Sequence, residues 1–198
     1  MSLNSGFEPA LDVLDNSGLP TKTRLTLIIT SLGAGGAERV LTSLANDWVG
    51  RNSAVHILTL AASDHQSHYA LDNRITVSHL NLTRDSSSAV QAVAANIQRV
   101  RVLRKAISAT KPDVVVSFID QTNILSLLAC LGLKIPVVVS ERIHPAYHPI
   151  GRFWTMLRFV TYPLAARVVV QTESAAQYFS TKLNNRLTII ANPVNQAP

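Results

Sequence analysis

Several features that define other protein classes are scarce in this 198-residue sequence. It holds one cysteine, Cys130, which excludes a disulfide scaffold and a cysteine-based zinc site. The longest apolar run, Ile124 to Leu133, falls far short of the roughly 20 residues that span a bilayer. The first residues are polar and lack the basic and apolar regions of a secretory signal. These absences predict a cytoplasmic protein without a transmembrane helix.

Charge is also sparse, since charged residues make up 15% of the chain and hydrophobic residues 47%. This balance excludes intrinsic disorder, which needs low hydrophobicity and high net charge. The net charge of +6 comes from scattered residues without a nucleic-acid-binding motif, so nucleic acid is not an expected partner. A basic protein does suit the inner membrane face, where anionic lipid attracts surface Lys and Arg at about 1 kcal/mol each.

Short apolar runs alternate with segments of helical periodicity. Most runs are continuous, as in strands buried on both faces. The alternation predicts one doubly wound, Rossmann-like α/β domain with a mainly parallel sheet. The predicted strands are Leu25–Ser31, Ala54–Leu60, Ile75–Leu80, Asp113–Ile119, Pro136–Ser140, Arg167–Gln171 and Leu187–Ala191. The predicted helices are Ala37–Val49, Ser87–Ala109, Asn123–Leu131, Arg152–Ala165 and Ser174–Leu183.

The domain boundaries follow from these runs. Residues 1–23 are expected to be a disordered leader and residues 24–191 the domain itself. Residues 192–198, which begin with Asn192-Pro193 after a buried-type strand, read as the start of an interdomain linker.

A glycine-rich segment joins the first predicted strand to the first helix. Gly33 and Gly35 match the first two glycines of a dinucleotide fingerprint, but Glu38 occupies the third position, and no P-loop lysine follows. Glycines admit a close ligand and a helix N-terminus attracts anions, so the segment is either a phosphate contact or a plain tight turn. The candidate phosphate-contact residues are Gly33, Gly35, Gly36, Glu38 and Arg39.

Polar residues also follow two later strands, at the edge where parallel sheets bind ligands. Asp120 can accept hydrogen bonds from a sugar hydroxyl or cap the next helix. Residues 140–149 gather an acid, a base, two histidines and a tyrosine, a density that favours a ligand but lacks the spacing of a metal site. Thr172-Glu173-Ser174 predicts a helix cap. The candidate ligand-contacting residues at this edge are Asp120, Asn123, Glu141, Arg142, His144 and Tyr147.

The predicted helix Arg152–Ala165 is apolar most of the way round and also contains arginines. Such a helix is either buried in the core or lies at a membrane interface. The candidate membrane contacts are Arg152, Trp154 and Arg158.

Four segments, in order and with fitting spacing over about residues 25–195, resemble family 4 glycosyltransferases of the GT-B fold. They are Gly35–Val40, Val116–Phe118 with Asn123, Pro136–Arg142 and Ala191–Val194.

The resemblance implies retaining transfer of a sugar from a nucleotide sugar, in a cleft between two Rossmann-like domains. This chain would be the N-terminal, acceptor-side domain, inactive without the nucleotide-sugar domain. The glycine-rich segment would face the donor phosphates with Gly33, Gly35, Gly36, Glu38 and Arg39. The acceptor side would be lined by Asp120, Asn123, Glu141, Arg142, His144 and Tyr147. The acceptor would be a glycan or a polyprenyl-diphosphate-linked saccharide of cell-surface polysaccharide or glycolipid synthesis. Arg152, Trp154 and Arg158 would then contact the diphosphate or the inner membrane face.

The same resemblance implies no cofactor beyond the donor substrate and assigns no catalytic residue. Ile143 stands where a family subgroup tends to have Asn, which leaves the role of His144 open. The alternative from another class is a non-catalytic module that binds a phosphorylated or lipid-linked sugar or a partner protein. A nicotinamide-dependent oxidoreductase is disfavoured by Glu38 and by the absence of a ribose-binding acid after the second strand.

Overall fold

The computed structural model describes residues 22–62, 67–83 and 89–192. The predicted leader up to Thr21 and the predicted linker from Pro193 onward lie outside the described residues. The strands are β1 (Arg24–Ile29), β2 (Ala54–Thr59), β3 (Thr76–His79), β4 (Val114–Phe118), β5 (Val137–Ser140), β6 (Arg167–Val170) and β7 (Leu187–Ile189). The helices are α1 (Gly36–Gly50), α2 (Ala89–Thr110), α3 (Asp120–Cys130), α4 (Arg152–Thr161) and α5 (Glu173–Leu183), with short 3-10 turns at Tyr162–Leu164 and Asn184–Arg186.

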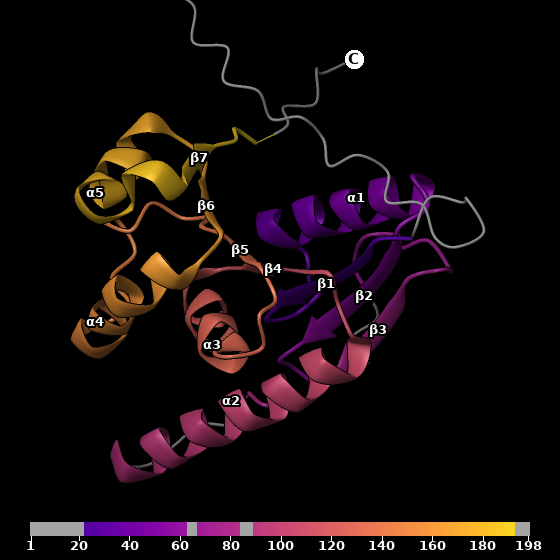
Figure 1. Ribbon diagram of the computed structural model, residues 1–198, viewed down its shortest axis with the longest axis horizontal. Coiled ribbons are helices and arrows are strands. Elements are labelled where there is room, and N and C mark those ends of the chain that lie inside the picture. Colours follow the sequence, from indigo (N-terminus) through magenta and orange to yellow (C-terminus); the bar gives the residue numbers. More distant parts are fainter. Residues whose placement is uncertain (1–21, 63–66, 84–88, 193–198) are drawn as a thin grey trace, which may run out of the picture.

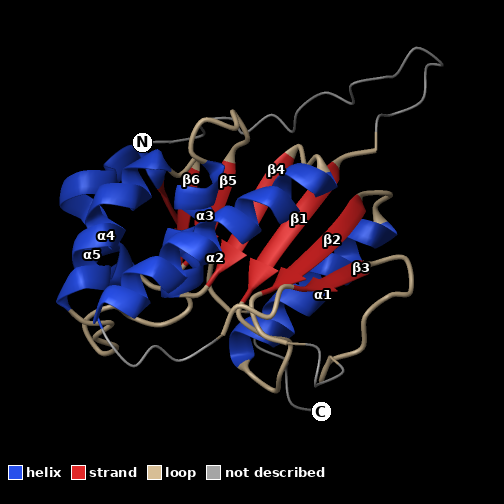
Figure 2. Cartoon of the chain, turned by 90° about the horizontal axis from the view of Figure 1, so that it is seen from below, coloured by secondary structure: helices blue, strands red, loops and turns tan. Residues whose placement is uncertain are grey.

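The described strands form one sheet in the order β3-β2-β1-β4-β5-β6-β7, and every neighbouring pair is parallel. The predicted doubly wound fold is therefore confirmed. The order changes direction between β1 and β4, and the carboxyl ends of all seven strands meet at one edge (Figure 2). In sheets of this kind ligands bind at that edge, beside the change of direction.

The continuous apolar runs became strands because both faces of the sheet are covered. Along β1, Leu27 and Ile29 pack into the core under α1, whereas Ile28 between them packs into the core on the opposite face. Figure 1 shows α1 on one side of the sheet and α2 and α3 on the other. Successive side chains of a strand point to opposite faces, so a strand between two helical layers needs apolar residues at every position.

Two described helix ends differ from the prediction by more than one residue. Helix α3 begins at Asp120 and not at the predicted Asn123. Helix α4 ends at Thr161 and not at the predicted Ala165, because the chain continues as a 3-10 turn that contains Pro163. Helix α2 is described from Ala89, and the predicted start at Ser87 lies outside the described residues. The predicted cap of α5 is confirmed, because the Thr172 hydroxyl accepts a hydrogen bond of 3.2 Å from the backbone of Ala175. No helix in the described part of the chain is long and apolar enough to cross a bilayer.

Candidate functional site

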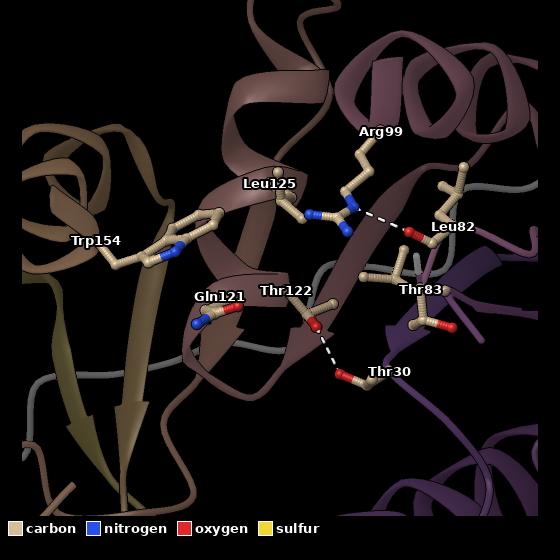
Figure 3. Close-up of a pocket in the computed structure, with 9 residues that line it drawn as sticks. Thr30, Leu82, Thr83, Arg99, Gln121, Thr122, Leu125 and Trp154 are labelled. Carbon is tan, nitrogen blue, oxygen red and sulfur yellow. Dashed lines mark hydrogen bonds between the residues drawn. The ribbon is translucent and has the colours of Figure 1, made fainter. Parts of the chain in front are cut away.

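A polar pocket of about 200 Å³ lies at the carboxyl ends of β1 to β4 (Figure 3). Thr30, just after β1, and Thr122 of α3 share a hydrogen bond of 2.9 Å across the change in strand order. Arg99 extends from α2, and its Nε donates to the Leu82 carbonyl at 2.9 Å. Hydroxyls, an amide, a guanidinium and an indole therefore surround one space. The lining residues are Thr30, Leu60, Leu82, Thr83, Arg99, Gln121, Thr122, Leu125 and Trp154.

An apolar groove of about 420 Å³ lies beside this pocket, between α2, α3 and α4. The groove and the pocket share Leu125 and Trp154 as lining residues. Val93, Ile97 and Phe153 line the groove and are about half exposed. A polar recess next to an apolar channel suits an amphiphilic ligand.

The outer face of α4 continues this apolar surface. Met156 and Val160 are exposed, as is Leu164 just beyond the helix, and Arg152 is exposed at its start. The interpretation of α4 as a helix buried all round is therefore wrong. Exposed apolar patches of this kind mark contact surfaces.

The inner face of α4 supplies a buried charge. Arg158 is only 2% exposed; its Nη2 lies 3.5 Å from Oδ2 of Asp120 and its Nε 3.3 Å from Oε1 of Glu141. Both acids are also buried; Asp120 is the first residue of α3, and Glu141 directly follows β5. The expectation that Arg158 contacts a membrane or a diphosphate therefore needs correction, because its guanidinium points into the domain.

A tyrosine and an asparagine complete this buried charge cluster. The Tyr162 hydroxyl donates to Oε1 of Glu141 and accepts from Nδ2 of Asn123 at 3.3 Å. Asn123 also donates to the Ser140 carbonyl at 3.1 Å, which ties α3 to β5. Asn123 is fully buried, so it supports the edge from within and does not itself reach an acceptor.

Burial dominates the titration of the cluster. It raises the pKa of Glu141 to about 7, although Arg158 and the Tyr162 hydrogen bond oppose the increase. Burial and the neighbouring Glu141 charge raise the pKa of Tyr162 well above its usual value. The phenol therefore remains protonated and can donate to the carboxylate at neutral pH.

The backbone at this edge is strained. Ile119, between β4 and α3, has φ of +72°. A β-branched side chain rarely adopts this region, and such strain is concentrated at functional sites. The unusual turn directs Asp120 into the cluster while Thr122, two residues later, lines the pocket.

The glycine-rich loop enters α1 at the same edge, and Glu38 folds back over its start. A Cβ at Gly35 would lie 2.0 Å from Oε2 of Glu38, so the carboxylate fills the space beside this glycine. An acid in the first turn is favoured by the helix dipole. Gly33, Gly36 and Arg39 are at least partly accessible. An anion approaching Gly35 would therefore require Glu38 to turn away.

The other predicted residues lie toward the outer rim. Arg142 donates to Oδ1 of Asn192, the last described residue after β7, and burial lowers the pKa of the guanidinium. His144 accepts from the backbone of Ala146 at 3.2 Å and lies against the ring of Tyr147. Tyr147 is 84% exposed. The predicted acceptor-side set is thus split between the buried cluster and this rim.

Most of the pocket residues were missed by the sequence-based prediction, which included only Trp154, as a membrane or diphosphate contact. Thr30 lies near the carboxyl end of the predicted strand Leu25–Ser31, and Thr122 lies three residues after the predicted strand Asp113–Ile119, so their position was the available signal. Arg99 gave none, because arginines on a surface helix usually face solvent.

Comparison with known proteins shows the family to which this chain belongs. Residues 34–197 match the sequence model of Glycosyltransferase Family 4. The chain belongs to this family. A relative from Campylobacter jejuni is 34% identical over 170 residues, which cover 86% of this chain and 46% of the relative. Its name is GalNAc-alpha-(1->4)-GalNAc-alpha-(1->3)-diNAcBac-PP-undecaprenol alpha-1,4-N-acetyl-D-galactosaminyltransferase.

Solved structures share the fold of this family 4 chain. Sucrose-phosphate synthase from Thermosynechococcus elongatus has a TM-score of 0.68 at 9% identity, with 86% of this chain and 48% of that one covered. Anabaena HepE, solved with UDP and glucose, has a TM-score of 0.62 at 16% identity, with 87% and 45% covered. The chain thus spans about half the length of the proteins it matches. Its fold is that of one Rossmann-like domain of a GT-B enzyme.

Proposed function

We propose that this chain is the N-terminal, acceptor-side domain of a retaining glycosyltransferase. The full-length enzyme would transfer a sugar from a nucleotide sugar to a glycan or lipid-linked saccharide, in cell-surface polysaccharide or glycolipid synthesis. The observation that supports this most is the polar pocket joined to an apolar groove through Leu125 and Trp154. A saccharide suits the hydroxyls of Thr30 and Thr122, and a lipid chain suits the groove. The Campylobacter relative, whose name includes a saccharide on PP-undecaprenol, favours the same class of acceptor.

The donor would meet the glycine-rich loop. The space beside Gly36 is open, which leaves room for a diphosphate at the N-terminus of α1, where backbone N–H groups bind anions. Glu38 would turn away as the diphosphate arrives, since two anions cannot share this position. Fixed N–H donors and the helix dipole would stabilise the departing diphosphate.

The nucleotide-sugar domain would follow Pro198 in the natural protein. The relative's 46% coverage supports this proposal. Sequencing the native gene past this point tests it directly. A further domain of similar size, with two glutamates seven residues apart, is the expected result. A stop codon after Pro198, with no partner subunit, would favour a non-catalytic sugar-binding module instead.

The activity itself is tested with the full-length protein, nucleotide sugars and polyprenyl-diphosphate-linked saccharides, by following labelled sugar into the lipid-soluble product. We expect transfer by the full-length protein and none by the 198-residue chain alone. Transfer of hydride from NADH, or tight binding of NADH, would instead revive the oxidoreductase hypothesis.

We also propose that α4 and the neighbouring part of α2 contact the inner face of the cytoplasmic membrane. Phe153, Met156 and Val160 form an exposed apolar face, and Arg152 and Arg101 are exposed near it. Aromatic and basic residues together suit an anionic lipid surface. Arg158 is no part of this surface.

Sedimentation with vesicles tests this contact. The chain should bind anionic phospholipid vesicles at low salt, bind neutral phosphatidylcholine vesicles weakly, and be released as salt rises. The double variant Phe153→Ser, Met156→Ser should lose binding. Ile190→Ser is the matched control, because it removes an equally exposed apolar residue beyond β7. Equal losses in the two variants, or no binding at low salt, would contradict the proposal.

A further inference from the structure

Two neighbouring aromatic residues of α4 have different surroundings. Phe153 is 52% exposed and lines the apolar groove but not the polar pocket. Trp154 is partly buried and lines both spaces. Their rings meet edge to face, with 5.9 Å between the centroids. Figure 3 shows the Trp154 indole reaching from α4 toward Gln121 and Leu125 of α3. Trp154 therefore lies where the pocket meets the groove.

The polar groups beside this indole have unused hydrogen-bonding capacity. In the part of the chain that the structure describes, neither the indole N–H of Trp154 nor the side-chain amide of Gln121 has a hydrogen-bond partner. The indole can donate a hydrogen bond, and the amide can both donate and accept. Thr30 and Thr83 add hydroxyls to the same lining. The pocket thus combines an aromatic face with polar groups that can still bind a ligand.

This combination favours a sugar over a lipid or a small anion as the occupant of the pocket. A lipid chain would leave the polar groups without partners, which costs free energy. A small anion would be repelled by the negative face of the aromatic ring. A sugar ring matches both features, because its faces carry C–H groups that pack on an aromatic ring and its edges carry hydroxyls.

We propose that Trp154 is the platform on which the ring of the acceptor sugar stacks, while the Gln121 amide bonds to a hydroxyl at the edge of that ring. The lipid chain of the acceptor continues past Leu125 into the groove. This inference rests on the proposed function. It gives Trp154 a role in acceptor specificity in place of the membrane contact expected from the sequence.

Steady-state kinetics of the full-length enzyme test this role, with one acceptor saccharide supplied both on polyprenyl diphosphate and as its methyl glycoside. Trp154→Leu should raise the KM of both acceptors by about tenfold or more while kcat stays within about threefold, because ground-state binding is lost. Trp154→Phe should recover most of that loss, since a smaller ring still offers a face. Gln121→Met should raise both KM values by about fivefold, the equivalent of one hydrogen bond.

Phe153→Leu is the matched comparison, because it changes the neighbouring aromatic residue, which lines the groove but not the pocket. It should raise the KM of the lipid-linked acceptor, whereas the methyl glycoside should bind as it does to the wild type. If Trp154→Leu gave this same pattern, Trp154 would be only a wall of the lipid groove, and the inference would be overturned.

Tryptophan fluorescence gives a readout that does not depend on turnover. The chain has two tryptophans, so in Trp48→Phe only Trp154 emits. The probes are methyl glycosides of the common hexoses and 2-acetamido-hexoses, with uridine as the competing aromatic ligand. At least one glycoside should shift the emission saturably, and Gln121→Met should weaken its binding. A shift with no glycoside, or with uridine alone, would overturn the inference.

Failure of the proposed function gives a different result. In that case the wild-type enzyme transfers no sugar from any nucleotide sugar, whatever the acceptor. The fluorescence of the 198-residue chain with methyl glycosides still decides whether Trp154 is a sugar platform.

Discussion

The carboxyl edge of the sheet has two halves that differ in where their polar side chains lie. On the β1 side the pocket is lined by neutral polar groups, such as Thr30 and Thr122, with one guanidinium. On the β5 side the acids Asp120 and Glu141 are turned inward onto Arg158. The two halves meet within one turn of α3. A polar residue after a strand can thus line the ligand space or brace it from behind, and helix α3 separates these roles.

The largest expected effect comes from breaking the buried half. Arg158→Met leaves two buried carboxylates without their cation, which should destabilise the domain by about 3–5 kcal/mol. Chemical denaturation of the 198-residue chain measures this. Arg101→Met, at an exposed position of α2, is the control and should change stability by less than about 0.5 kcal/mol. Similar losses of stability in Arg158→Met and Arg101→Met would mean that the buried charge cluster contributes no more to stability than an exposed arginine.

The pH dependence of stability tests the same buried half through the titration of Glu141. Since the folded pKa of Glu141 is about 7, above the usual 4.5, the folded state holds this proton more tightly than the unfolded state. Stability from this group is therefore present at pH 4.5 and lost as pH rises to about 7, by roughly 2 kcal/mol between pH 5 and pH 8. Glu141→Gln should remove this decline.

The stability of Glu141→Gln must be compared with that of the parent protein at each pH. His56 acts in the opposite direction, because burial lowers its pKa and stability from it grows as pH rises through 6.5. Asp72→Asn is the control. The Arg74 guanidinium lowers the pKa of Asp72 to about 2, so this carboxylate titrates below the window. An unchanged pH slope in Glu141→Gln would show that Glu141 titrates normally.

The smallest effect is expected in the open half. Thr122→Val removes the hydroxyl bonded to Thr30 and should cost about 1 kcal/mol of stability. In the full-length enzyme it should raise the acceptor KM by up to tenfold, the equivalent of one hydrogen bond. Thr42→Val is the control, because the buried Thr42 hydroxyl in α1 has no hydrogen-bond partner among the described residues. A fall in kcat without a change in KM would argue against ground-state acceptor binding here.

Much of the fold was predictable from local patterns. The apolar runs identified the seven described strands within one or two residues at most ends, because parallel strands between helical layers are apolar throughout. The glycine-rich loop and the motifs around Asn123 and Glu141 indicated the family, which residues 34–197 then matched.

The site was only partly predictable. Asp120, Asn123 and Glu141 were predicted together, and the structure does bring them together, but inside the domain instead of on its surface. Arg158 was assigned to the wrong face of α4. Helical periodicity could not settle this, because apolar residues surround the helix and either arginine could have pointed inward.

The sequence by itself determined the order of strands and helices and the edge at which polar residues gather. The spacing of apolar residues, which distinguishes strands from helices, is a local property that can be read from the sequence alone. Only the tertiary structure decided which polar groups are buried and which are open. Arg158 lies in α4, Asp120 begins α3 and Glu141 follows β5, so their pairing depends on how α4 packs against α3. A buried charge is tolerated only where partners converge on it, and that convergence is a property of packing in space.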